Sequence, residues 1–279
     1  MLSAAVIDDV DIFPQEHEAD GLTLRGVPVA HGRSHPPVTL TWPQVAEVIR
    51  GLDPDSTQAR HRLGRWLSQV WWLAELPEEM LRDAARLVGL PAGHVLHPGR
   101  DWPVGHVLGG AVEVGFGVAE LDPARAGEVV VVSPAAVRAA GLDSRGWLAP
   151  AAERLRRLSE LAAQRLRRDR DSPVTPYGGA DALTLLAGRA LRAQLTGREG
   201  DGLALVAAPA RTRAWTRLSS IDPTYIPLAY AATEPALRGF PAALLVSADE
   251  VVLARAGQQA GVALRDAGPQ EPRQIILRG

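Results

Sequence analysis

The amino-acid sequence predicts an α+β protein with a helical N-terminal third, two small mixed strand/helix units and a C-terminal β-hairpin. Two observations support this fold class. Apolar residues recur at helical spacing through much of the first hundred residues. Beyond residue 100, short β-branched runs alternate with helix-like segments. Such a mixture of strands and helices is typical of α+β proteins.

The N-terminal third is expected to begin with a strand and continue as three helices. Residues 23–30 (TLRGVPVA) alternate loosely, as an edge strand does. Thr41 is a candidate N-cap with Pro43 in the first turn of the first helix. The third helix is expected over 77–88, closed by Gly89. The second helix carries an apolar stripe of Leu63, Trp66, Leu67, Val70, Trp71 and Ala74.

The middle of the chain combines strands with the longest predicted helix. Segments 111–121 and 128–133 are rich in valine and predict strands, and a short helix is expected over 134–141. Residues 145–168 predict a long amphipathic helix. Its apolar stripe is formed by Leu148, Ala151, Leu155, Leu158, Ala162 and Leu166.

A proline- and glycine-rich segment, 171–179, predicts a linker to the last unit. The elements expected beyond it are a helix over 180–195, strands over 203–207 and 212–218, a helix over 225–237 and a hairpin over 242–254. The predicted divisions are therefore a helical region 1–100, a middle unit 101–172, a C-terminal unit 177–257 and a weakly ordered tail 258–279.

The composition excludes several classes of chemistry. The chain has no cysteine, so thiol nucleophiles, thiolate ligands and disulfides are absent. All 30 basic residues are arginine, so a Schiff-base or phosphate-loop lysine is absent too. The acidic first residues do not resemble a signal peptide, and no apolar run is long enough for a membrane span, so we expect a cytoplasmic protein without membrane contact.

Several tracts carry a family resemblance. They are VVVVSPAAVRAAGLDSRGWLAPAAERLRRL, GGADALTLLAGRAL, LALVAAPARTRAW and ALLVSADEVVLA. From about Val112 to Leu253 the order of elements resembles the YtpQ-like family of uncharacterised bacterial proteins. The resemblance implies a bacterial origin and a similar fold, but no activity and no catalytic residues. The tryptophan-rich helices of the first hundred residues depart from the family.

The segment 94–106 (HVLHPGRDWPVGH) is the candidate metal site. His94, His97, Asp101 and His106 are residue types that bind zinc, nickel or iron. A metal-dependent hydrolase is therefore one alternative function. The prolines and glycines of this segment oppose a helix that would gather the imidazoles. The competing interpretation is a turn-rich approach to a strand, with Trp102 packed on the core.

Arginines form a candidate nucleic-acid surface on the long helix and on the strand 212–218. Basic residues interleaved with an aromatic suit phosphate tracking and base stacking. The candidate residues are Arg157, Arg168, Arg211, Arg213, Trp215 and Arg217. Acidic residues are interspersed along the same helix, which favours a solvated, salt-bridged face instead.

The sequence as a whole favours a non-enzymatic protein-protein interaction or adaptor module with an unknown protein partner and no cofactor. GFGVAE (115–120) lies inside a predicted strand, so it does not match a dinucleotide-binding loop. Tryptophan is enriched at interaction hot spots. Trp72, which lies about 100° around the helix from Trp71, and Trp102 are therefore the expected partner-binding residues.

Overall fold

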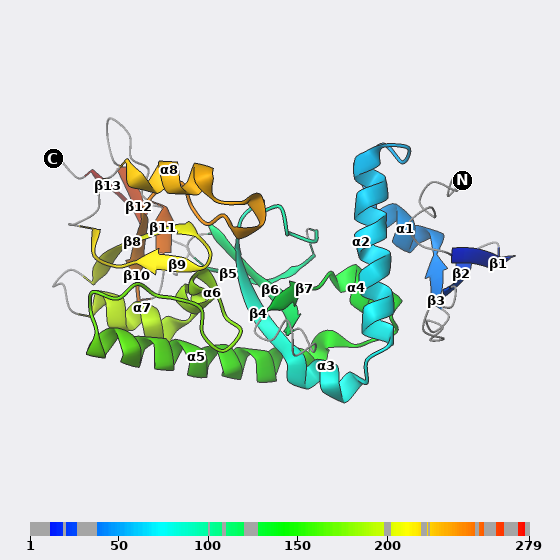
Figure 1. Ribbon diagram of the computed structural model, residues 1–279, viewed down its shortest axis with the longest axis horizontal. Coiled ribbons are helices and arrows are strands. Elements are labelled where there is room, and N and C mark those ends of the chain that lie inside the picture. The colour runs from blue at the N-terminus through cyan, green and yellow to red at the C-terminus, as the bar shows by residue number, and fades with distance from the viewer. Residues whose placement is uncertain are drawn as a thin grey trace. The chain divides into compact units, whose positions relative to one another are not determined.

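The computed structural model describes residues 12–18, 21–26, 38–99, 101–107, 110–119, 128–197, 202–218, 222, 224–248, 251–253, 261–264 and 273–276. It is an α+β protein whose strands pair in antiparallel fashion (Figure 1). The chain divides into two compact units. Unit 1 is Met1–Ala84 with Val132–Trp147, and unit 2 is Ala85–Val131 with Leu148–Gly279. This division differs from the expected sequential domains, because the segment 132–147 belongs with the N-terminal helices.

Unit 1 combines a three-stranded sheet with helices. Its sheet has the order β1-β2-β3, and two of its helices, α1 and α4, pack against the long helix α2. The strands are β1 (Ile12–Glu18), β2 (Gly21–Gly26) and β3 (Val38–Thr41). The helices are α1 (Trp42–Val48), α2 (Thr57–Ala74), α3 (Glu78–Ala84), α4 (Pro134–Ala139) and the 3-10 turn η3 (Ser144–Trp147).

Local sequence signals explain the helices of unit 1. Thr41 caps α1, and the side chain of Gln44 accepts from the Thr41 backbone N–H, which completes a capping box. The predicted α2 stripe is buried except at Ala74, which is half-buried, and Trp66 and Trp71 are about 5% exposed or less. α4 packs against α2, where the Gln69 side chain accepts from the Ser133 backbone N–H at 3.1 Å.

The third predicted helix is wrong beyond Ala84. The chain leaves α3 there and forms β4 (Ala85–Pro91), which pairs along its whole length with β6 (Val112–Ala119). Val88 and Leu90 are thereby buried in the sheet. Pairing with a strand more than twenty residues away overrides the helical periodicity of this segment. Two more strands complete this sheet. β5 (Pro103–Val107) pairs with the first half of β6, and β7 (Val129–Val131) pairs with its last residues.

The second sheet of unit 2 lies between helices. Its order is β11-β10-β8-β9, formed by β8 (Leu203–Ala210), β9 (Arg213–Trp215), β10 (Leu244–Ser247) and β11 (Val251–Leu253). The hairpin β10–β11 confirms the predicted C-terminal hairpin. α7 (Arg189–Thr196) packs on β10 and β8, and α8 (Tyr225–Ala232) packs on β8; Figure 1 shows α8 and α7 on opposite faces of the sheet.

The long helix α5 (Leu148–Arg168) organises the core of unit 2. It packs against β4, α7 and α6 (Ala182–Ala187). The single helix expected over 180–195 is two helices, broken at Gly188. A Cβ at Gly188 would lie 2.3 Å from Ser159 of α5, whose hydroxyl accepts from the Leu191 backbone N–H at 2.9 Å. The core of unit 2 includes Leu166, Leu183, Leu185, Leu191, Val206, Leu244 and Val246.

Two short elements follow. The 3-10 turn η5 (Pro235–Leu237) comes after α8, and β12 (Gly261–Leu264) pairs with β13 (Arg273–Ile276). Most of the expected tail 258–279 lies outside the described residues. No helix in the described part of the chain combines the length and the apolar character needed to span a membrane.

Candidate functional site

The histidine segment forms turns that lead into β5. Both turns are closed by an imidazole: Nδ1 of His94 accepts from the Leu96 backbone N–H, and Nδ1 of His97 accepts from the Gly99 backbone N–H, each at 3.2 Å. A backbone N–H can only donate, so each neutral imidazole carries its proton on Nε2. This agrees with the turn-rich interpretation of the segment.

Trp102 lies at the centre of this region and is fully buried. Its indole Nε1–H donates to the Phe116 carbonyl of β6 at 2.8 Å, and the ring makes an edge contact with His97 at 5.1 Å between centroids. The prediction that Trp102 contacts a partner is therefore wrong for this conformation, because its ring has no exposed surface. Gly115, opposite the ring, belongs to a strand rather than to a nucleotide-binding loop.

His97 and Glu113 resemble a catalytic pair, but both ring nitrogens of His97 already contact other groups of the protein. Its Nε2 lies 2.9 Å from Oε2 of Glu113, and its Nδ1 is held by the Gly99 N–H. A general base needs a nitrogen within hydrogen-bond reach of a substrate proton. Burial lowers the pKa of His97, and the neighbouring Glu113 carboxylate opposes that effect. The pair therefore acts as a structural contact between the turn and β6.

The four predicted metal ligands do not assemble into a metal site. Asp101 and His106 are exposed, whereas His94 and His97 are largely covered. Among the described residues, no group of three His, Asp or Glu side chains is arranged to hold a metal ion. The geometry of the described residues therefore gives the hydrolase alternative no support.

A buried ion pair lies close to His94. Arg211, between β8 and β9, binds the Asp181 carboxylate at 2.6 Å, and the two side chains are only 11% and 15% exposed. The Asp181 carboxylate also caps α6 by accepting from the Thr184 N–H at 2.7 Å. Arg211 further donates to the Ala236 carbonyl at 3.3 Å. This arginine therefore joins α6 to η5.

Burial lowers the pKa of His94 to about 4, and the Arg211 charge adds to this effect, while Asp181 and the Arg238 backbone oppose it. The unfolded chain takes up the proton near its ordinary pKa of about 6.5. The folded form stays neutral down to about pH 4. The stability contributed by neutral His94 is thus complete above pH 6.5 and is lost as the pH falls toward 4.

We expect the free energy of unfolding to fall by about 1–2 kcal/mol more between pH 7 and pH 5 in the native chain than in His94→Asn. Asparagine keeps an acceptor for the Leu96 N–H but does not titrate. Urea unfolding at the two pH values measures the difference. His106→Gln is the matched variant, because it replaces an exposed histidine of the same unit. Equal pH dependence in the native chain and His94→Asn would refute the assignment.

The arginines proposed to bind nucleic acid do not form one accessible basic surface. Arg211 is buried against Asp181, so its predicted contact with nucleic acid is wrong for this conformation. Arg157 pairs with Glu153 at 2.7 Å, and Arg217 pairs with Asp171. Hydrogen bonds from Arg156 and Arg157 lower the pKa of Glu153 to about 2. Acidic residues therefore neutralise much of this face, as the salt-bridged interpretation predicted.

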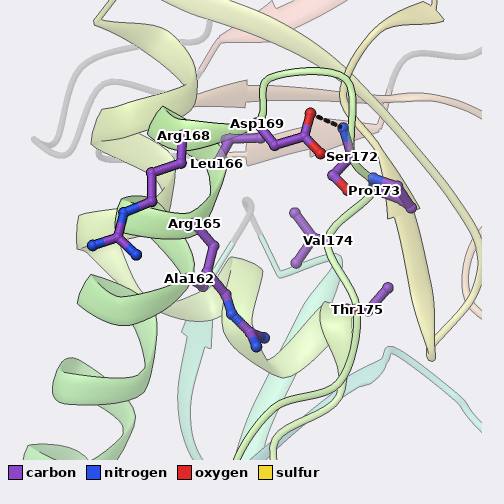
Figure 2. A pocket seen from close by; sticks show the side chains of 9 residues that line it. All are labelled: Ala162, Arg165, Leu166, Arg168, Asp169, Ser172, Pro173, Val174 and Thr175. Carbon is purple, nitrogen blue, oxygen red and sulfur yellow. Dashed lines mark hydrogen bonds between the residues drawn. The ribbon is translucent and has the colours of Figure 1, made fainter.

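A cavity of about 380 Å³ lies between the C-terminal end of α5 and the segment 172–175 (Figure 2). Arg165 and Arg168 line it, but Figure 2 shows their guanidinium groups pointing apart. Arg165 stacks on Tyr177 at 4.4 Å, and Asp169 accepts from the Ser172 N–H at 3.3 Å. The two cations lie in the last turn of α5, where the helix dipole stabilises them. The stacking on Tyr177 and the helix dipole stabilise these two arginine charges, so no bound ligand is needed to explain them.

The most unusual surface of unit 2 is on α8. The helix YIPLAYAA has no charged or strongly polar side chain except its tyrosine hydroxyls, and only Ile226 is buried. A soluble surface helix ordinarily turns polar residues to water. We define the α8 surface as Trp215, Tyr225, Leu228, Ala231 and Ala232. Leu228 is 67% exposed and Tyr225 is 43% exposed.

Local contacts hold the α8 surface in place. Asp222 accepts from the Thr224 backbone N–H at 2.8 Å at the start of the helix. Arg238 donates to the Ala231 and Thr233 carbonyls at its end. Trp215 of β9 meets Tyr225 edge-on at 5.8 Å, and the exposed Arg213 lies 5.8 Å from the Trp215 ring centroid. The surface is thus a supported apolar patch with a cation at one end.

Of the predicted site residues, Arg213 and Trp215 therefore belong to this patch, but in an apolar rather than a phosphate-binding setting. Trp72 is half-buried on α2 of unit 1, where its partner-binding role stays a prediction. Sequence reasoning missed α8 as a surface.

Comparisons of the chain with family models, with curated proteins and with solved structures found no match, so a function must be inferred from this geometry.

Proposed function

We propose that this protein is a protein-protein interaction module and that the α8 surface makes the contact. The observation that carries the proposal is the 67% exposure of Leu228 in a helix without a polar face. Burying such apolar area contributes roughly 25 cal/mol per Å² on association. The underlying helix is supported on β8 and capped at its end, so little conformational entropy is lost on binding.

The composition of the surface agrees with this role. Trp215 and Tyr225 are of the residue types that dominate binding energy at protein interfaces. Leu228 stands on the side of α8 opposite the buried Ile226, because two residues turn a helix by about 200°. Ala231 and Ala232 leave room for close approach of a second backbone. The surface therefore has aromatic side chains at one end, an exposed leucine at its centre and small side chains at the other end.

The test places a photoreactive benzoylphenylalanine at Leu228 in cells that naturally produce the protein. We expect illumination to yield one or a few adducts of defined mass, and we expect Trp215→Ala in the same chain to reduce their yield at least about fivefold. The matched control places the photoreactive residue at Leu161 of α5, which is 40% exposed in the same unit. Absence of an adduct at Leu228, or equal adducts at both positions, would refute the proposal.

A further inference from the structure

The cavity at the C-terminal end of α5 has an apolar floor and a polar rim. Ala162, Leu166 and Val174 are each 7% exposed and belong to the core of unit 2, and they form the floor. Ser172 and Thr175 are exposed and add hydroxyl groups to the rim. The volume of about 380 Å³ lies within the range of small-molecule sites, roughly 300–1,000 Å³. The cavity is therefore large enough for a small molecule with an apolar body.

Backbone hydrogen bonds fix the loop that walls this cavity. Val174 and Ala214 of β9 exchange hydrogen bonds at 2.8 and 3.0 Å, which joins the loop to the sheet. Tyr177 and Ala180 exchange a second pair at 2.9 and 3.0 Å. The Tyr177 ring packs against the core and holds the Arg165 guanidinium at 4.4 Å. The wall and the cation are thus in place before a ligand arrives, so binding loses little conformational entropy.

The charges around the cavity are mainly positive. Four arginines lie in and just after the last turn of α5: Arg165, Arg167, Arg168 and Arg170. All four are exposed, and within the described residues none of them forms an ion pair. The opposing charges are the Asp169 carboxylate, which accepts from two backbone N–H groups of the next turn, and the helix dipole, whose negative end amounts to about half a charge. The excess of positive charge favours an anionic ligand.

The orientation of Arg165 gives the anion a place. Figure 2 shows the Arg165 guanidinium on the side of the loop 172–175, whereas that of Arg168 points away. Stacking on Tyr177 uses the face of the guanidinium, and in the described part of the chain no acceptor is bonded to its N–H groups. A guanidinium presents these N–H groups as a planar fork that matches a carboxylate.

We propose that this cavity binds a small organic carboxylate, with the carboxylate on Arg165 and the apolar body on Leu166 and Val174. The inference goes beyond the proposed function and does not depend on the α8 surface. Arg165 is exposed, so solvent screens its ion pair with the ligand. We therefore expect a dissociation constant on the order of 0.1–1 mM rather than tight binding.

The first test uses 2-naphthoate as the probe, because it combines a carboxylate with a flat apolar body. Isothermal titration calorimetry should show that 2-naphthamide, which lacks the charge, and acetate, which lacks the body, bind at least about tenfold more weakly. In amide NMR spectra, 2-naphthoate should shift the resonances of Leu166, Val174 and Thr175. No binding, equal binding of 2-naphthamide, or shifts confined to other residues would overturn the proposal.

Two charge variants distinguish a site from general attraction. Arg165→Gln removes the proposed contact and should weaken the binding of 2-naphthoate at least about tenfold. Arg167→Gln removes the same charge from the same turn but does not line the cavity, so binding should stay within about twofold of the native chain. Equal losses in the two variants would leave only general attraction and would overturn the proposal.

Filling the cavity tests the apolar part of the site. Thr175→Trp and Ser172→Phe each add a large ring at the exposed rim, so the circular dichroism should remain native while 2-naphthoate binds at least about tenfold more weakly. Native affinity in both folded variants would overturn the proposal. None of these outcomes alters the photochemical capture expected at Leu228, so the carboxylate site and the proposed function can fail separately.

Discussion

Replacing Gly115 by alanine should lower the free energy of unfolding of unit 2 by about 3 kcal/mol. A Cβ on Gly115 would lie 2.3 Å from the Trp102 ring and 2.7 Å from the Trp102 carbonyl oxygen. The ring cannot retreat, because it is fully buried and its Nε1–H is bonded to the Phe116 carbonyl. Urea unfolding followed by far-ultraviolet circular dichroism measures the change.

The matched control for this substitution is Gly105→Ala in the neighbouring strand β5. No atom outside the immediate chain lies within 4 Å of a Cβ built at Gly105, so we expect a change within about 0.5 kcal/mol. Trp102→Leu should restore part of the stability lost in Gly115→Ala, because the smaller side chain leaves room for the added methyl group. Equal stability of the two glycine variants would contradict the packing described for Trp102.

Elements with a local signal were predicted well from the sequence. Thr41 and Gln44 form a capping box whose residues lie within one turn of each other. The predicted stripe of α5 is buried at Ala151, Leu155, Ala162 and Leu166, but Leu158 is half-buried and Leu148, at the start of the helix, is exposed. The strand β4 was missed because its partner β6 lies far along the chain, and the periodicity of residues 85–88 fits a helix equally well. The break at Gly188 depends on Ser159 of another helix, so no local pattern reveals it.

The candidate site was harder to predict, because exposure is decided by tertiary packing. The sequence singles out Trp102 as a large aromatic, but a pocket opened by Gly115 buries it. The pairing of Arg211 with Asp181 joins residues thirty positions apart. α8 did carry a usable signal, because none of its eight side chains is charged. A short helix of this composition either is covered by its own fold or presents an apolar face.

Replacing Arg211 by methionine should destabilise unit 2 by about 2–4 kcal/mol. The change leaves the Asp181 carboxylate, which is only 15% exposed, without its cation. It also removes the hydrogen bond to the Ala236 carbonyl that ties η5 to the sheet. Asp181→Asn keeps an acceptor that can cap α6 but leaves the Arg211 guanidinium buried without its counter-charge, so we expect a loss of similar size.

The double variant Arg211→Met with Asp181→Asn separates the ion pair from the packing around it. Each single variant is expected to lose stability mainly because a buried charge is left without its partner. The double variant should then be more stable than the sum of the two single losses predicts, by about 1.5 kcal/mol or more. Arg217→Met is the matched control, because its ion pair with Asp171 is at the surface, where both side chains are at least 60% exposed. Its loss should stay within about 0.5 kcal/mol, since solvent screens an exposed pair. Strict additivity of the Arg211 and Asp181 losses would show that packing, rather than the buried charge pair, joins α6 to η5.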